Sequence, residues 1–348
     1  MAEKQKLFID FQVTQRCNHK CIYCQCKLAE RWGELSFQEI NNLFKWLQKL
    51  GPSICLILNG GEPFLREDII EIIRLAKSTY HFARVAVLTN GTLLTQYVPQ
   101  IIKTELDEII ISLDGWDDKS LNLHAFVDGS FKKIIESIET LKKYKKRKYP
   151  LIKITTVITQ KNIDNLMDII KLTHLKGADK WQPLPMQYCL QSSIHKNMAL
   201  RLQDLEKLKN VIVQCYRKYP GFLFVSPNYW RLIQNYITQN FQVPDKCYGG
   251  FNSFYITSDG YVFPCYRYCS FSYQEVNDWI NKIHFEHSKF HYFDLSTLAI
   301  LTRKIGEWVT AKREIFCRGC CHSGNAQFSD KDFGDYKYLQ EIINNTMQ

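Results

Sequence analysis

The first half of the chain alternates short apolar runs with amphipathic stretches, and this alternation is the strongest constraint on its fold. The runs have the length and composition of buried strands, and they lie at 7–13, 54–58, 83–88, 107–113, 151–158 and 180–186. The stretches between them follow a helical period, at 36–50, 67–78, 93–102, 130–145 and 163–175. Ser36 and Glu39 have the spacing of a capping box at the start of the first helix. The succession predicts an α/β fold with a partial (β/α)6 barrel.

Three cysteines directly follow the first predicted strand. Cys17, Cys21 and Cys24 lie in the run RCNHKCIYC, which offers three thiolates and no fourth ligand at a regular spacing. The carboxyl end of a barrel strand is where β/α-barrel enzymes place their chemistry. On the triplet alone, a zinc site completed by Cys26 or His19 and a structural iron–sulfur cluster with a distant fourth thiolate both stay open.

The second predicted strand breaks into Gly60-Gly61-Glu62-Pro63. Paired glycines let a backbone approach a ligand closely, and a carboxylate beside them suits an ammonium group. The third and fourth strands end in TNG and SLDG, which contain Asn90, Ser112 and Asp114. Each of these two turns is ordinary by itself, because Asn-Gly and Asp-Gly are common turn dipeptides.

Taken in order, these motifs resemble the radical S-adenosylmethionine (radical SAM) enzymes, which carry C-x3-C-x-aromatic-C after the first strand and a GGEP-like turn after the second. The resemblance implies that Cys17, Cys21 and Cys24 hold a 4Fe-4S cluster whose open iron binds the amino and carboxylate groups of SAM. It also implies contacts to SAM from residues at the strand ends. These are Tyr23 near the adenine, Gly60, Gly61, Glu62 and Pro63 at the methionyl amine, and Asn90, Ser112, Asp114 and the backbone of Val157.

A second group of cysteines lies near the end of the chain. We expect a hairpin with an Asp259-Gly260 turn between Cys247 and Cys265, and Cys317 and Cys320 form a C-x2-C knuckle. The pattern resembles the Twitch form of the SPASM extension. It implies that Cys247, Cys265, Cys317 and Cys320 ligate one auxiliary 4Fe-4S cluster. A four-cysteine zinc site stays open, as does replacement of one ligand by Cys269 or Cys321.

These observations divide the chain into a sequence of expected parts. We expect a radical SAM core at 1–190, a helical connection at 191–246, an auxiliary-cluster domain at 247–325 and a C-terminal helix at 326–348. The auxiliary domain is expected to be a small α+β extension, with a β-hairpin and helices.

Composition and charge indicate the compartment and the partners that we expect for the protein. No apolar run is long enough to span a bilayer, and the start MAEKQKLF has no signal-peptide pattern, so we expect a cytoplasmic protein without membrane association. In a reducing compartment, 13 cysteines indicate metal binding rather than disulfides. The net charge is +10, but the run KKYKKRK at 142–148 fits a solvated helix end, so nucleic acid is not an expected partner.

The resemblance implies a reaction that starts with reductive cleavage of SAM to a 5'-deoxyadenosyl radical, which abstracts a hydrogen atom from the substrate. An external one-electron donor of the flavodoxin or ferredoxin type would supply the electron. Because the first strand begins at Leu7, with no peptide-binding domain before it, we expect oxidation of a small polar molecule, such as an aminocyclitol or sugar.

Two alternatives stay open at this point. One is a peptide maturase that cross-links or epimerises a residue, with Cys189 or Cys269 as a hydrogen-atom donor. The other, from a different class, is a non-catalytic iron–sulfur electron carrier. Cyclisation of a nucleotide is not favoured, because the chain ends in NNTMQ rather than in a Gly-Gly tail.

Overall fold

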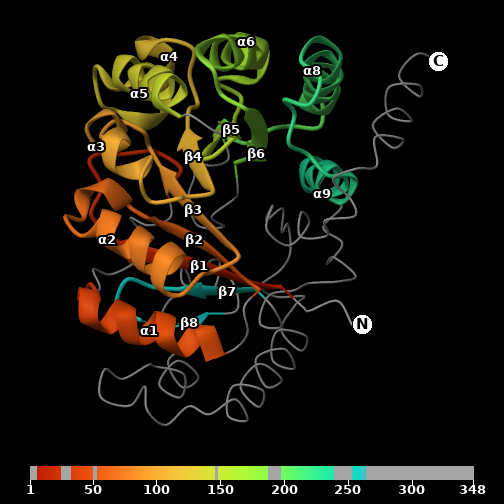
Figure 1. Ribbon diagram of the computed structural model, residues 1–348. Helices are drawn as coiled ribbons and strands as arrows, with labels where there is room; N and C mark the ends of the chain where they lie inside the picture. The colour runs from red at the N-terminus through yellow and green to blue at the C-terminus, as the bar shows by residue number, and fades with distance from the viewer. Residues whose placement is uncertain are drawn as a thin grey trace.

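One sheet organises the part of the chain that the computed structural model describes (Figure 1). That part comprises residues 6–24, 33–49, 53–145, 148–186, 197–238, 253–260 and 262–263. The sheet has eight strands in the order β6-β5-β4-β3-β2-β1-β7-β8, and all neighbouring pairs are parallel except β7 and β8. The strands are β1 (Leu7–Thr14), β2 (Ile54–Gly60), β3 (Arg84–Thr89), β4 (Glu108–Ser112), β5 (Leu151–Ile158), β6 (Lys180–Pro185), β7 (Ser253–Ile256) and β8 (Val262–Phe263). The sheet is open, so the predicted partial barrel is confirmed.

Helices connect successive strands and cover one face of the sheet (Figure 1). They are α1 (Phe37–Lys49), α2 (Ile69–Arg74) with the π-helical turn η3 (Leu75–Thr79), α3 (Leu94–Ile101), α4 (Asp118–Ala125), α5 (Ser130–Tyr144), α6 (Leu166–Lys176), α8 (Asp204–Lys218) and α9 (Pro227–Ile237), with short 3-10 turns η2 (Pro63–Leu65) and η4 (Ile163–Asn165). The predicted capping box at α1 is present, since the Ser36 amide donates to Glu39 at 2.7 Å and the Glu39 amide donates to Ser36 Oγ at 3.3 Å. No helix within the described ranges is long and apolar enough to cross a membrane.

One helix was not predicted, and another lies in the expected helical connection. Helix α4 was not predicted, because it is too short to show a helical period and its capping box uses Asp117 with Ser120 rather than with a glutamate. Helix α9 arises in the aromatic-rich stretch after α8, where Ser226 accepts from the Tyr229 amide and Pro227 occupies the first turn.

The two faces of β1 have different environments. Phe11 lies on the helix-covered face, where its ring meets that of Phe44 from α1 edge-on at 6.3 Å. Because side chains alternate along a strand, Phe8, Asp10 and Gln12 lie on the opposite face. Charged residues continue on this face in β4 and β5, where buried Glu108 pairs with Arg84 and lies 2.8 Å from Lys153 Nζ. This inner face of the sheet therefore carries charged side chains among its apolar ones, whereas the helix-covered face is apolar.

The predicted hairpin around Asp259-Gly260 is confirmed, but its pairing with the barrel sheet was not predicted. Strand β7 pairs in parallel with β1, with Asp10 opposite Tyr255 and Phe11 opposite Ile256, so the hairpin extends the barrel sheet. The Leu35 amide donates to the Ser258 carbonyl at 2.7 Å, which also fixes the hairpin to the chain before α1. The proposed ligands Cys247, Cys265, Cys317 and Cys320, together with Cys189, Cys269 and Cys321, lie outside the described residues.

Arg66 joins three segments near the cysteine end of the sheet. Its guanidinium is buried and donates to the Val13 carbonyl at the end of β1 and to the Leu35 carbonyl before α1, both at 2.9 Å. It also pairs with Asp68, the residue that precedes α2, at 2.7 Å. One side chain thus satisfies two buried carbonyls and one carboxylate.

We predict that Arg66→Met lowers the free energy of unfolding by about 3 kcal/mol, because it leaves these acceptors buried without their donor. Arg74→Met is the matched control, since Arg74 is exposed and its contact with Glu71 is 3.5 Å long. The control should change the free energy by less than about 0.5 kcal/mol. Equal losses in the two variants, measured by anaerobic denaturant unfolding, would contradict this account of Arg66.

Candidate active site

The cysteine motif forms a loop at the carboxyl end of β1. The Cys24 amide donates to the Cys21 carbonyl at 3.2 Å, which makes a tight turn of the second half of the motif. The His19 amide approaches Cys17 Sγ at 3.4 Å; burial raises the pKa of this thiol, and the His19 contact counters that shift. Cys17 is exposed, and Cys21 and Cys24 are half-buried. In the described part of the chain, no three His, Cys, Asp or Glu side chains converge enough to hold one metal ion, whereas a 4Fe-4S cube takes one cysteine per iron.

The GGEP turn lies directly against the chain that leads into this loop. The Gly61 amide donates to the Thr14 carbonyl at 2.8 Å, and the Glu62 amide donates to the Arg16 carbonyl at 2.7 Å. A Cβ atom on Gly60 would lie 2.2 Å from the Thr14 oxygen, and one on Gly61 would lie 2.2 Å from the Arg16 oxygen. The glycines are needed for contact between two protein segments, whereas the sequence suggested a close approach to a ligand. This contact fixes the position from which Cys17 leaves the sheet.

Glu62 links the second turn to the third. Its carboxylate is buried and accepts from the Phe64 amide at 3.1 Å, from Thr89 Oγ1 at 2.7 Å and from the Asn90 amide at 2.7 Å. Burial raises the pKa of this carboxyl to about 7, although the three donors counter that shift. These contacts are all with protein, so the expected contact of Glu62 with an amine stays a prediction. Pro63 begins the short turn η2 and is buried.

Asn90 connects the third turn to the cysteine loop. Its Nδ2 donates to Asn18 Oδ1 at 2.7 Å, and its Oδ1 accepts from the Thr92 hydroxyl at 2.7 Å. Asn18 Nδ2 in turn donates to Thr92 Oγ1 at 2.9 Å. Asn18 and Thr92 were not predicted, since an asparagine inside the motif and a threonine in a turn carry no distinctive sequence signal.

Tyr23, Asp114 and Val157 come together on the other side of the loop. The Tyr23 hydroxyl donates to Asp114 Oδ2, and the Val157 amide donates to Asp114 Oδ1 at 2.6 Å. Burial raises the pKa of the Tyr23 hydroxyl well above its usual value, to which the Asp114 charge adds, and burial also raises the pKa of Asp114. The Val157 carbonyl accepts from Asn162 Nδ2 at 2.9 Å, so both backbone groups of Val157 have protein partners. Ser112 ends β4 and is half-buried.

Helix α4 contributes a contact that sequence reasoning missed. The carbonyls of His124 and Ala125 accept from the amides of Ile22 at 2.8 Å and of Lys20 at 3.1 Å. The buried His124 ring is paired with Thr159 Oγ1 at 2.9 Å, and its centroid lies 6.3 Å from that of Tyr23. The helix ends at Phe126 in the left-handed region, with φ of 52°, which leaves these terminal carbonyls open to the cysteine loop.

A small apolar cluster adjoins Tyr23 at the ends of β5 and β6. Met186, Met198 and Ala199 form it, and Ile22, Tyr23 and Val157 pack against it. It is separate from the main core, whose members lie between the sheet and the helices. An apolar wall beside an aromatic ring suits a planar, weakly polar group such as a purine base.

A family model matches the part of the chain that contains this site. Residues 11–173 match the Radical SAM superfamily. The matched radical SAM segment contains the three cysteines and the turns that follow β2, β3, β4 and β5.

Two curated relatives show the range of similar proteins. Over 184 residues the chain is 29% identical to molybdenum cofactor biosynthesis protein moc-5 of Caenorhabditis elegans, a match that covers 51% of this chain and 30% of moc-5. Over 274 residues it is 28% identical to the AdoMet-dependent heme synthase of Oleidesulfovibrio alaskensis, covering 74% of this chain and 69% of that protein. The chain thus spans less than a third of moc-5.

Solved structures share the fold. Native anSMEcpe with bound AdoMet superposes with a TM-score of 0.67 at 19% identity, over 98% of this chain and 100% of that one. The same protein with AdoMet and the Cp18Cys peptide superposes with a TM-score of 0.62 at 19% identity, over 98% of this chain and 99% of that one. At this identity the similarity establishes the fold, an open α/β barrel.

Gly61→Ala tests the docking of the GGEP turn. The added methyl group would meet the Arg16 carbonyl, so the turn and the cysteine loop must separate, and we expect the iron bound after anaerobic reconstitution to fall by at least about half. Gly33→Ala is the control, because no atom lies within 4 Å of the place that its added methyl group would take. Full iron content in Gly61→Ala would show that the loop does not depend on this contact.

Tyr23→Phe tests the link between Tyr23 and Asp114. Removal of the hydroxyl leaves a buried carboxylate short of one donor, so the free energy of unfolding should fall by about 1.5 kcal/mol. Tyr144→Phe removes a hydroxyl from a ring that is 49% exposed and should have no measurable effect. Denaturant unfolding of both variants gives the comparison, and equal stabilities would refute the link.

Proposed function

We propose that this chain is a radical SAM enzyme. The observation that supports it most is the loop 17–24, whose three cysteines lie at the carboxyl end of the sheet. Its backbone contacts the end of α4, and the residues that lead into it, Thr14 and Arg16, contact the turn after β2. The match of residues 11–173 to the superfamily supports the same proposal independently of the geometry.

The residues of the loop fit a 4Fe-4S cluster. The loop offers three thiols, and there is no fourth cysteine between 17 and 24. The His19 amide donates to Cys17 Sγ. When bound, the cluster would give one electron to SAM, which yields methionine and a 5'-deoxyadenosyl radical that takes a hydrogen atom from the substrate to become 5'-deoxyadenosine.

The protein's own part is to orient SAM. Tyr23 and the cluster of Met186 and Met198 would contact the adenine, with Tyr23 held in place by Asp114. At the other end, the backbone of Gly60 and Gly61 would contact the methionyl amine. Glu62 would position these contacts, because its carboxylate holds the turns after β2 and β3 together. Asn90 and Ser112 would complete the polar side of the site.

The outcome of the reaction depends on the substrate and on the C-terminal cysteines. We infer oxidation of a small polar molecule, with one auxiliary 4Fe-4S cluster held by Cys247, Cys265, Cys317 and Cys320 as electron acceptor and an external flavodoxin or ferredoxin as donor. A peptide substrate is the second candidate, because anSMEcpe, which has this fold, holds the Cp18Cys peptide beside AdoMet. In that case the product would be a cross-linked, oxidised or epimerised residue, with Cys189 or Cys269 as the hydrogen donor in epimerisation.

Anaerobic reconstitution followed by addition of SAM and dithionite tests the proposal. The protein should form 5'-deoxyadenosine, and the Cys17→Ala, Cys21→Ala, Cys24→Ala triple variant should form none. Cys215→Ala, which changes a buried cysteine of α8, should keep the activity. A reconstituted protein that forms no deoxyadenosine would instead support an electron carrier.

Metal analysis of the same samples tests the auxiliary site. About eight irons in the wild type and about four in the triple variant would fit two 4Fe-4S clusters. Zinc retained in the triple variant, at one ion per chain, would contradict the auxiliary cluster and leave the radical SAM site intact.

A further inference from the structure

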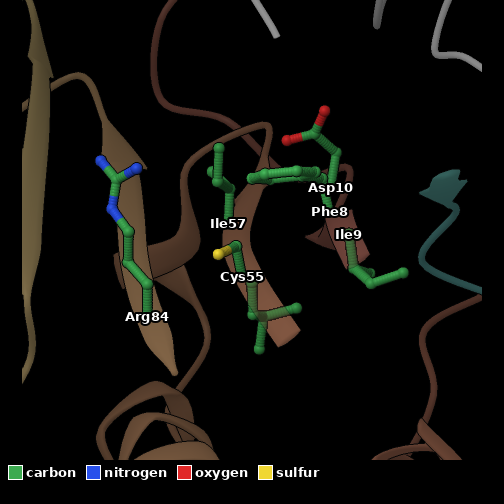
Figure 2. A pocket seen from close by; sticks show the side chains of 7 residues that line it. Phe8, Ile9, Asp10, Cys55, Ile57 and Arg84 are labelled. Carbon is green, nitrogen blue, oxygen red and sulfur yellow. The ribbon is translucent and has the colours of Figure 1, made fainter. Parts of the chain in front are cut away.

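A small cavity lies on the inner face of the sheet, away from the cysteine loop. Its volume is ≈ 20 Å³, enough for one water-sized group. Three neighbouring strands line it, with Phe8, Ile9 and Asp10 from β1, Cys55, Leu56 and Ile57 from β2, and Arg84 from β3. Figure 2 shows the Asp10 carboxyl at the edge of this apolar lining.

Asp10 has no counter-ion there. Among the described residues, none forms an ion pair with its carboxyl or donates a hydrogen bond to it, and burial alone raises its pKa to about 7. Arg84, the basic residue of the lining, pairs with Glu108 instead, and the side chains of Cys55 and Ile57 lie between it and Asp10 (Figure 2). Asp10 is half-buried, so its carboxyl stays accessible to a ligand, and carboxyls with a raised pKa concentrate at functional sites.

The chemistry of the cavity selects the ligand. A primary ammonium group has the size of a water molecule and supplies the missing positive charge with three donors. The apolar atoms of Phe8 and Ile57 suit the aliphatic carbons that carry such a group. An anionic group would be repelled by the Asp10 carboxylate. The guanidinium of Arg84 could not compensate, because it is already paired with Glu108.

The position of Asp10 also suits an anchor for the substrate. Asp10 precedes Thr14, the last residue of β1, by four positions, which corresponds to about 13 Å along a strand. A group bound at Asp10 would therefore be remote from the radical, and its binding energy could orient the reacting carbon at the other end of the molecule.

We propose that this cavity binds a primary ammonium group of the substrate, with the Asp10 carboxylate as its counter-ion. The proposal rests on the proposed function, because the molecule bound here is taken to be the substrate that loses a hydrogen atom to the radical. It applies equally to a small amine and to a lysyl side chain, since both present the same group.

Binding of n-butylammonium to the reconstituted full-length protein tests this proposal. We expect saturation-transfer NMR at pH 8 and constant ionic strength to detect binding to the wild type. Asp10→Asn should weaken binding at least about tenfold, because the ligand loses a charged partner. Asp164→Asn, which neutralises an exposed carboxylate, should bind as the wild type does. Nα-acetyl-lysine methylamide is the second probe. If it binds more tightly than n-butylammonium, the ammonium group belongs to a lysyl side chain rather than to a small amine.

Two results would overturn the proposal: no amine binding by the wild type, or equal binding by Asp10→Asn. Neither depends on SAM cleavage, so deoxyadenosine formed without substrate would still support the proposed function.

A thermal scan of Asp10→Asn confirms that the variant is folded. The pKa of Asp10 is higher in the folded protein than in the unfolded chain, so the folded state binds the proton more tightly and ionisation destabilises it as pH rises towards about 7. The melting temperature of Asp10→Asn relative to the wild type should therefore be higher at pH 8 than at pH 5. Among the residues that the structure describes, Cys55, Arg84 and, on β7, Tyr255 are the other ionisable groups beside this position, and they are unchanged in the variant. A variant that does not gain stability at pH 8 would show that the pKa of Asp10 is not raised in the folded protein.

Discussion

Two backbone hydrogen bonds, from Gly61 to Thr14 and from Glu62 to Arg16, determine where the cysteine loop leaves the sheet. They form because two glycines let the turn after β2 approach the end of β1 closer than any side chain would allow. The Glu62 carboxylate then carries the constraint to the turn after β3. The loop is thus positioned by the ends of three parallel strands, which are rigid because helices pack against them.

The opposite side of the loop is fixed by different chemistry. There α4 supplies two terminal carbonyls, and Asp114 joins Tyr23 to the end of β5. Each side contains a buried carboxylate that needs its donors, Glu62 on one side and Asp114 on the other, so loss of one contact affects the others.

The sequence predicts those parts of the structure that depend on local pattern. The six strands, the capping box at Ser36 and the hairpin turn at Gly260 each follow from a short run of residues. The pairing of β7 with β1, the link from Glu62 to Thr89 and the contact of His124 with the loop depend on residues far apart in the chain. No single run encodes them. For the same reason Asp10 reads as one polar residue in an apolar strand, and its lack of a partner becomes visible once β2 and β3 are in place.

The central claim is that the open iron of a cluster held by Cys17, Cys21 and Cys24 binds SAM. Electron–nuclear double resonance on the reduced protein, with ¹⁵N in the methionyl amino group of SAM, measures that contact directly. The account predicts a ¹⁵N coupling to the cluster spin in the wild type and none in the Cys17→Ala, Cys21→Ala, Cys24→Ala variant. Tight binding of labelled SAM to the wild type without any ¹⁵N coupling would contradict it.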